Sequence, residues 1–279
     1  MKHFIEQLVN AGIEESEAKK EILILKSEIK DKEKIKKIVS ERIKTRIPIQ
    51  YLIGKAYFMD FEVRVNSKVL IPRPETEILV EETVRRGVLQ YACRDMPWHV
   101  LDIGTGSGII AIALAKLIPN IKITVIDIDK EIIDLANENA KLNNVSEKIN
   151  FKVCDLFSDC FEELLQNQKF DLIISNPPYV RSKVEAIHEL PVLVQPEIMH
   201  EPEIALYGSK ENKTGLIYYE RIIELCRRGV LQYARTILAF EIDPPLVNDL
   251  KSLLKKNGFE NFEIIKDYAG LDRCLFIFR

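Results

Sequence analysis

The chain has 279 residues, of which 47% are hydrophobic and 30% charged, and its formal net charge is -3 at pH 7. This length accommodates one large domain and a small one, because domains usually span ~100–200 residues. The small net charge gives no general attraction to nucleic acid or to an acidic membrane surface, and no run of ~18 apolar residues is present to span a membrane. The N-terminus becomes charged before any stretch of signal-peptide length, so we expect a cytoplasmic protein.

Residues 1–47 are predicted to form a small helical domain. Apolar residues recur there at the three- and four-residue spacings of amphipathic helices. The segment from Lys30 to Arg46 carries eight basic and three acidic residues. A solvated helix face is the simpler interpretation of this charge, and a docking surface for an RNA-bound or acidic partner is the alternative. Pro48 ends the helical unit, because a residue before proline avoids the α conformation.

Residues 48–84 are predicted to be a linker that contains a β-hairpin. Alternating apolar residues over 61–65 and an apolar run over 69–71 flank the turn-forming pair Asn66-Ser67. We therefore expect a hairpin within Tyr57–Ile71, followed by a helix over Glu75–Val84.

Residues 85–279 alternate short apolar strands with longer amphipathic helices. This alternation predicts an α/β fold with a mostly parallel sheet covered on both faces, and seven strands suit the Rossmann-like sheet of class I methyltransferases, whose last strand is antiparallel. The expected strands are Val100–Ile103, Ile123–Ile126, Asn150–Val153, Leu172–Ser175, Ile237–Glu241, Phe262–Ile265 and Cys274–Phe278. The expected helices are Ile109–Leu117, Lys130–Leu142, Cys160–Gln166, Thr214–Arg227 and Pro244–Asn257.

An eight-residue sequence, RRGVLQYA, occurs twice, at 85–92 and at 227–234. Nothing else repeats with the same period, which excludes a solenoid or a duplicated fold. Each copy precedes a predicted core strand, so we interpret the copies as insertions in surface connections, where added residues are tolerated.

The five cysteines are scattered and form no C-x-x-C pair. Their spacing predicts neither a disulfide framework nor a zinc site, and the four dispersed histidines add no metal-ligand pattern. We expect reduced, mostly buried thiols and no metal.

Three acidic or glycine-rich strand ends predict a nucleotide-type site. Gly104-Thr105-Gly106-Ser107-Gly108 joins a strand to a helix, and its spacing is not that of the dinucleotide fingerprint. Asp127 ends the next strand, where a carboxylate can accept hydrogen bonds from a ribose diol, while Asp129 is the better helix cap. Asp155 and Leu156 follow the third strand and are candidates to contact adenine.

The tetrapeptide Asn176-Pro177-Pro178-Tyr179 follows the fourth strand and points to methylation of a planar NH2 group. Such a nitrogen is a poor nucleophile, so catalysis must come from positioning and electrostatics. The Asn176 side-chain oxygen and the Pro177 carbonyl can each accept one N–H. The prolines hold that carbonyl rigidly, and the Tyr179 ring can stack on the planar acceptor.

These motifs resemble those of the release factor glutamine methyltransferases of the HemK type. The resemblance covers nearly the whole chain, including Pro48–Gly54, Pro72-Arg73-Pro74-Glu75-Thr76-Glu77 and Glu201–Gly208. It implies that S-adenosylmethionine is bound by the glycine turn and Asp127, that residues 176–179 receive the glutamine of a Gly-Gly-Gln motif, and that the helical domain helps to dock the release factor. We extend the candidate cofactor contacts to Asp155, Leu156 and Asn176, and the candidate substrate contacts to Arg73 and Glu75. Relatives often carry an aromatic residue at the position of Leu156.

Other acceptors share parts of this pattern. Adenine-N6 methyltransferases of DNA or RNA carry the same tetrapeptide, but they need a basic groove that the catalytic half lacks. A glutamine of a ribosomal protein is a nearer alternative, although its enzymes carry a different sequence at positions 72–76. A non-enzymatic module would not be expected to keep the tetrapeptide intact.

Overall fold

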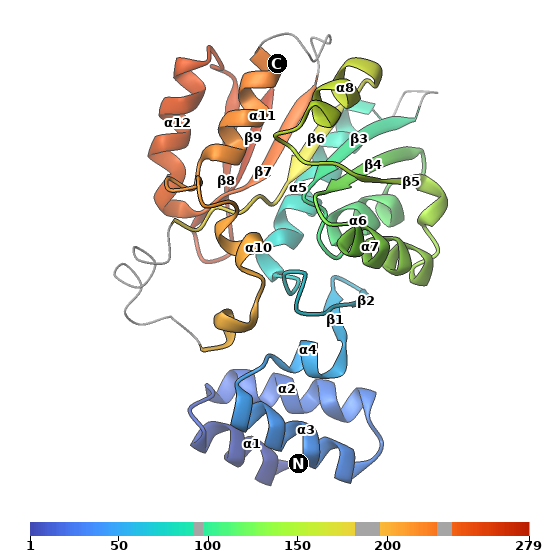
Figure 1. The fold of residues 1–279 in the computed structure, drawn as a ribbon, viewed down its shortest axis with the longest axis vertical. Coiled ribbons are helices and arrows are strands. Elements are labelled where there is room, and N and C mark those ends of the chain that lie inside the picture. Colours follow the sequence, from blue (N-terminus) through green and yellow to red (C-terminus); the bar gives the residue numbers. More distant parts are fainter. Residues whose placement is uncertain (92–96, 182–195, 228–235, 279) are drawn as a thin grey trace.

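The computed structural model describes residues 1–91, 97–181, 196–227 and 236–278 (Figure 1). A small helical unit at the N-terminus is joined through a short hairpin to a larger domain built on a central sheet (Figure 1). Within the described ranges, no helix is long and apolar enough to cross a membrane.

The N-terminal unit consists of helices, as the apolar spacing predicted. Leu8, Leu25 and Val39 come from three different helices and meet in a separate small core. Asp31 caps the third of these helices, because its carboxylate accepts the backbone N–H of Glu33 at 2.9 Å. The helices are α1 (Lys2–Asn10), α2 (Glu15–Glu28), α3 (Lys32–Thr45) and a short α4 (Ile49–Ile53) that begins directly after Pro48.

The hairpin lies earlier in the chain than the sequence predicted. Strands β1 (Lys55–Phe58) and β2 (Phe61–Arg64) pair antiparallel around a turn at 59–60, so the expected turn at Asn66-Ser67 is wrong. Met59 adopts a positive φ of 51°, which is unusual for a residue with a side chain, and the sequence therefore gives no turn signal there. The segment 69–71, expected to be the second strand, is a loop.

The large domain contains the predicted seven-stranded sheet. Its order is β5-β4-β3-β6-β7-β9-β8, and all neighbours run parallel except β9, which is antiparallel to both β7 and β8. The fold class is confirmed. The strands are β3 (Trp98–Ile103), β4 (Ile121–Asp127), β5 (Ile149–Val153), β6 (Leu172–Ser175), β7 (Ile237–Glu241), β8 (Phe262–Lys266) and β9 (Asp272–Phe278).

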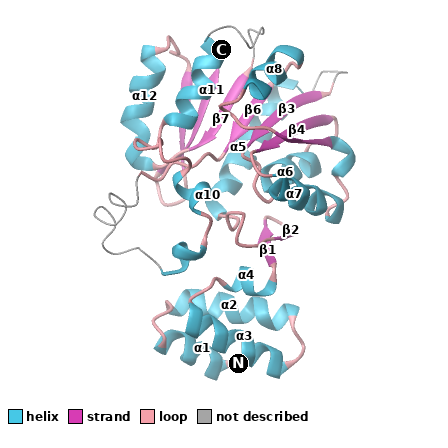
Figure 2. Ribbon diagram, in the orientation of Figure 1, coloured by secondary structure: helices cyan, strands magenta, loops and turns pink. Residues whose placement is uncertain are grey.

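Helices cover both faces of this sheet (Figure 2). Successive residues of one strand enter different cores: Val100 packs into one cluster and Leu101 into the other. The first cluster includes α5 (Pro74–Tyr91), α6 (Ile109–Leu117) and α7 (Lys130–Leu142), and the second includes α8 (Asp159–Asn167), α11 (Ile217–Arg227) and α12 (Val247–Lys256). Short helices complete the domain: η1 (Ser146–Lys148), η2 (Pro196–His200), α10 (Glu203–Tyr207) and η3 (Pro244–Leu246).

The strand order creates a crevice at one edge of the sheet. Strand β3 leads to β4 on one side, whereas its other neighbour β6 leads to β7 on the opposite side. Ligands of open α/β sheets bind at such a switch point, outside the carboxyl ends of the strands. The glycine turn after β3 and the tetrapeptide after β6 therefore meet there.

The first copy of the repeated sequence is not a surface connection, so that expectation is wrong. Residues 85–91 form the last turns of α5, which continues well beyond the predicted end at Val84. Arg86 is buried, donates to Glu263 and lies 4.3 Å from the centre of the Phe276 ring. Gly87 packs so closely against Trp98 that a Cβ there would come within 2.6 Å of the indole ring. Of the second copy, only Arg227 lies within the described residues.

Candidate active site

A cavity of about 240 Å³ opens at the carboxyl ends of β3, β4, β5 and β6. The loop 68–73, which precedes α5, forms one of its walls, and this includes the segment that sequence analysis expected to be a strand. Most of the predicted site residues line this cavity: Arg73, Gly104, Thr105, Gly106, Ser107, Asp127, Asp155, Leu156, Asn176, Pro177 and Pro178. Gly108, Tyr179 and Glu75 do not line it.

The glycine turn leaves open space for a ligand beside its backbone. Gly104 and Gly106 adopt φ of 69° and 55°, and a Cβ on either would meet no atom within 4 Å. Gly108 has a different role, because a Cβ there would lie 3.3 Å from the Cβ of Ala136 on α7. The first two glycines thus let a ligand approach the backbone, and the third lets α6 and α7 pack closely.

Asp127 is fixed at the end of β4. Its Oδ2 accepts the N–H of Gly106 at 3.1 Å and its Oδ1 accepts the N–H of Ile128 at 2.8 Å. Burial raises the pKa of this carboxyl, while these backbone hydrogen bonds lower it. Asp129 caps α7 by accepting the N–H of Glu131 at 2.7 Å, which confirms the distinction drawn from the sequence.

A second acid lies beneath the glycine turn and was not predicted as a site residue. Asp102 on β3 is fully buried, and its Oδ2 accepts the Thr105 hydroxyl at 2.7 Å. Burial raises its pKa to about 7. Within the described residues, its Oδ1 has no hydrogen-bond partner.

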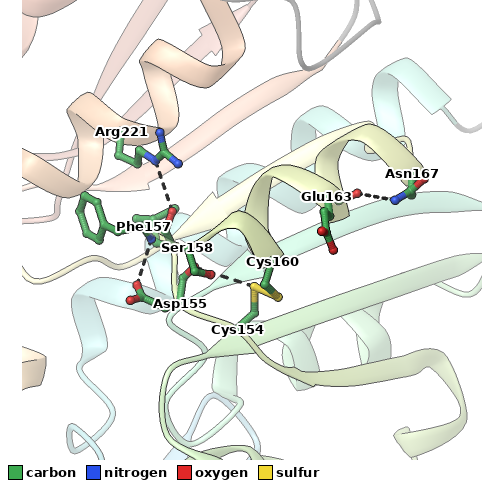
Figure 3. Close-up of a disulfide and its surroundings, with 9 residues drawn as sticks. Cys154, Asp155, Phe157, Ser158, Cys160, Glu163, Asn167 and Arg221 are labelled. Carbon is green, nitrogen blue, oxygen red and sulfur yellow. Dashed lines mark hydrogen bonds between the residues drawn. A yellow bond between two sulfur atoms is a disulfide. The ribbon is translucent and has the colours of Figure 1, made fainter.

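The loop after β5 closes another side of the cavity, and a disulfide joins it to the first turn of α8 (Figure 3). Cys154 pairs with Cys160 at a Cα–Cα distance of 6.0 Å, so the prediction that all thiols are reduced is wrong. The loop brings together two cysteines separated by six positions, a spacing that matches no recognised pattern. Cys226 and Cys274 are both buried, and Cys274 is a free thiol, as expected.

Two aromatic residues stand beside Leu156 in this wall. Phe157 follows it directly, and its ring packs edge-on against the ring of Tyr218 at 5.6 Å. Both rings line the cavity. Asp155 accepts the N–H of Phe157 at 2.9 Å, which orders the turn (Figure 3). The aromatic surface expected near position 156 is therefore supplied by the neighbouring residues Phe157 and Tyr218.

A buried hydrogen-bond chain holds the Asn176–Tyr179 tetrapeptide from behind. Asn176 Nδ2 donates to Thr76 Oγ1 at 3.3 Å, and Thr76 Oγ1 in turn donates to Glu241 Oε2 at 2.6 Å. The Tyr179 hydroxyl donates to the other oxygen, Glu241 Oε1, at 3.2 Å. The Tyr179 ring packs against the core cluster and not into the cavity.

The sequence offered only weak signals for the residues behind the tetrapeptide. Thr76 stands inside the motif of residues 72–77, and Glu241 is one more acidic residue at a strand end. Nothing local links these two positions, which are 165 residues apart. Asn212 was also missed, although its Nδ2 donates to the Pro178 carbonyl at 3.1 Å.

Arg73 forms an ion pair at the rim of the cavity with Glu201, whose side chain is almost fully buried. Burial raises the pKa of Glu201, and the adjacent guanidinium opposes that rise. Glu75 is half-buried near Glu241 and raises the pKa of that carboxyl through its charge. Within the described residues, no group of three acidic, histidine or cysteine side chains could hold a metal ion.

A charged contact joins the helical unit to η2, which lies close in sequence to Glu201, the partner of the cavity residue Arg73. Glu197 on η2 accepts from Arg42 Nη1 at 2.9 Å and pairs with Arg46 Nη2 at 2.8 Å. Arg42 is almost fully buried and also pairs with Glu21 of α2 at 2.8 Å. The N-terminal helical unit therefore contacts η2, which shortly precedes α10.

Comparisons with known proteins identify the same chemistry. Residues 87–194 match the model of the family "Methyltransferase small domain". The release factor glutamine methyltransferase of Thermodesulfovibrio yellowstonii is 37% identical over 244 residues, which cover 87% of this chain and 80% of that protein. The protein of the same name from Flavobacterium psychrophilum is 37% identical over 84% of this chain and 76% of its own length.

Solved structures share the fold at low identity. A METTL16 methyltransferase domain superposes with a TM-score of 0.53 at 18% identity and covers 77% of this chain and 87% of its own. The N-terminal domain of human METTL16 gives a TM-score of 0.53 at 14% identity, covering 86% and 78%. These likenesses describe the fold alone.

Proposed function

Because the chain belongs to the release factor glutamine methyltransferases, we propose that its Asn176–Tyr179 tetrapeptide binds a glutamine amide beside the methyl donor. The protein is an enzyme that transfers a methyl group from S-adenosylmethionine to the glutamine of a release factor. In the product, N5-methylglutamine, a methyl group replaces one hydrogen of the side-chain amide. The alternatives, a nucleobase or a glutamine of a ribosomal protein, are not favoured.

The cavity suits S-adenosylmethionine. Open space beside Gly104 and Gly106 lets the donor approach the backbone, and the Asp127 carboxylate supplies acceptors for a ribose diol. Leu156, Phe157 and Tyr218 offer apolar and aromatic surface for adenine. We propose that Asp155 accepts from the adenine amine and that Thr105 and Ser107 complete the turn around the donor.

S-adenosylmethionine supplies an electrophilic methyl group, so the protein's task is to position the amide nitrogen. We propose that Asn176 Oδ1 and the Pro177 carbonyl each accept one N–H of that amide. Two acceptors increase the electron density on the nitrogen and fix its direction of attack. As the new N–C bond forms, the S–C bond to the methyl group breaks and S-adenosylhomocysteine leaves with the electron pair. The methylated nitrogen then loses one proton to solvent, and no side chain needs to act as a strong base.

The remaining predicted substrate contacts are those of Arg73, Glu75 and Tyr179. Arg73 lines the cavity, and we propose that it contacts the backbone of the incoming loop. Glu75 does not line the cavity, so we propose that it contacts substrate only at the rim of the cavity. Stacking of Tyr179 on the amide stays a prediction, because in this structure its ring packs on the core.

We propose that residues 1–47 form a docking domain, 48–84 a linker and 85–279 the methyltransferase domain. The contact of Glu197 with Arg42 and Arg46 supports a docking role, because it ties the helical unit to η2 of the larger domain. A release factor bound to both would present its Gly-Gly-Gln loop to the tetrapeptide.

Label transfer tests the proposal directly. The protein is incubated with methyl-labelled S-adenosylmethionine and, separately, with a release factor, with the same factor carrying Gln→Ala in its Gly-Gly-Gln loop, and with DNA. We expect label only in the unaltered factor. The variant Asn176→Ala should lose turnover by about 100-fold or more while it binds the donor within a few-fold of wild type. Equal labelling of both factors would contradict the glutamine assignment.

A further inference from the structure

Glu241 is a buried acid that has no direct role in the proposed binding of the methyl donor or of the glutamine amide. It ends β7, is 1% exposed and does not line the cavity. Both of its carboxylate oxygens nevertheless accept hydrogen bonds from elements of the active site: one from Thr76 of α5 and one from Tyr179 of the tetrapeptide. Its backbone carbonyl accepts the Tyr219 hydroxyl at 2.8 Å, which fixes it further.

The direction of these hydrogen bonds determines how Asn176 is oriented. An ionised carboxylate only accepts, so the single proton of the Thr76 hydroxyl must point to Glu241. The Thr76 oxygen then has only lone pairs to offer, and the group of Asn176 that faces it must be the donor Nδ2. Asn176 Oδ1 is consequently left for the cavity, and among the described residues it accepts no other hydrogen bond.

We propose that Glu241 is a positioning residue that acts through Thr76 to hold Asn176 with its oxygen, and not its nitrogen, toward the substrate. This inference rests on the proposed role of Asn176 as an acceptor for the glutamine amide. A reversed side chain would present N–H groups to the N–H groups of the substrate, and a hydrogen bond that orients the nucleophile would be lost.

The protonation state of Glu241 controls the same orientation. A protonated carboxyl can donate to Thr76, whose hydroxyl is then free to donate to Asn176 Oδ1 and favour the reversed side chain. Burial raises the pKa of Glu241, as does the charge of Glu75, and Arg273 on β9 opposes the rise. Other titratable groups near it are Asp243, the hydroxyls of Tyr179 and Tyr219, and the buried thiol of Cys274, which is paired with it in register.

Substitutions of Glu241 and Thr76 test this role through single-turnover methylation of the release factor. In Glu241→Gln the new amide can donate to Thr76, so we expect the rate to fall by about 10- to 100-fold. Thr76→Val should show a similar loss, and Thr76→Ser, which keeps the hydroxyl, should recover most of the rate. The dissociation constant of S-adenosylmethionine should stay within about three-fold of wild type in all three.

The pH dependence separates orientation from simple structural support. The wild-type rate should rise with pH through a pKa above 4.5, the ordinary value of glutamate, and Glu241→Gln should lack this rise. A Glu241→Gln rate equal to wild type, an unchanged pH profile, or a Thr76→Ser variant as slow as Thr76→Val would overturn the inference. If Glu241→Gln does not fold, the comparison of Thr76→Ser with Thr76→Val decides alone.

The control Asn176→Ala distinguishes this inference from the proposed function. If Asn176→Ala stays active, the amide site itself is wrongly assigned. If Asn176→Ala is inactive while Glu241→Gln is unaffected, only the role of Glu241 is wrong.

Discussion

Asp102 illustrates how one residue of this site can oppose the stability of the fold. It is fully buried under the glycine turn, and among the described residues its one hydrogen bond comes from the Thr105 hydroxyl. No cation is among the described groups that shift its pKa. Its pKa of about 7 lies above the ordinary value of 3.8, so the folded protein holds a proton that the unfolded chain releases between these pH values. The contribution of Asp102 to stability is therefore present at acidic pH and is lost as pH rises toward 7.

We predict that Asp102→Asn becomes more stable relative to wild type as pH rises from 5 to 8. The neutral amide avoids ionisation in an apolar site, and at about 1.4 kcal/mol per pKa unit the gain is on the order of 3 kcal/mol. Urea unfolding of both proteins at several pH values measures it, since shifts of all other groups cancel in the difference. A difference that does not change with pH would show that Asp102 is ionised throughout.

The predicted site residues that the structure brings to the cavity are those whose sequence signal is local. Gly104, Gly106 and Asp127 stand at strand ends, where chain direction and fold class together dictate their position. Thr76 and Glu241 could not be paired in the same way, because only the packing of α5 against β7 brings them together. A buried polar partner of a catalytic residue is a property of the tertiary structure.

At the scale of elements, the apolar pattern predicted the sheet strands and the long helices well and the linker poorly. The alternation at Phe61 and Val63 was read correctly as a strand, since both are buried. Its partner strand lies upstream, where Ala56 and Phe58 fill the other half of the core, and the turn between them depends on the positive φ of Met59. Sequence patterns do not predict a backbone conformation that the residue type at that position disfavours.

Among the contacts between elements, the ion pairs of Glu197 bear most directly on the proposed docking of the substrate. Its Oε1 atom contacts both Arg42 and Arg46 of the helical unit, and its side chain is only 16% exposed. Loss of this charge should loosen the placement of the helical unit against η2 without disturbing the donor cavity.

We predict that Glu197→Gln raises the KM for the release factor by about 10-fold, with kcat and the dissociation constant of S-adenosylmethionine nearly unchanged. Steady-state methylation at varied release factor concentrations measures this. Glu138→Gln is a matched control, because Glu138 pairs with Arg64 at 2.9 Å on an exposed surface. Equal effects of the two substitutions would argue against a link through Glu197.

At the scale of the whole molecule, the first copy of the repeated sequence is part of a helix that packs on the central sheet. Residues 85–91 of the first copy supply two turns of α5 and a buried arginine that contacts β8 and β9, so they belong to the sheet domain and not to a loop. Helix α5 also begins at the residues that hold Asn176. One helix thus runs from the substrate site to the repeat, and its stability matters to both.

The lysines of α3 give the helical unit a positively charged surface. Lys32, Lys34, Lys36, Lys37 and Lys44 are exposed, and none of them forms an ion pair with another described residue. The same helix carries Arg42, which contacts η2. A substrate with acidic groups that bridges the helical unit and the cavity would be attracted by this face.

We predict that the triple substitution of Lys34, Lys37 and Lys44 by glutamate lowers kcat/KM for the release factor by about 10-fold at low salt, with donor affinity unchanged. The loss should shrink as salt rises, because exposed charges are screened over about 10 Å at 0.1 M ionic strength. The control reverses three exposed lysines of α12, Lys251, Lys255 and Lys256, which lie on the sheet domain. Equal losses in both variants would mean that only net charge matters, and no loss in either would leave the α3 lysines as a solvated face.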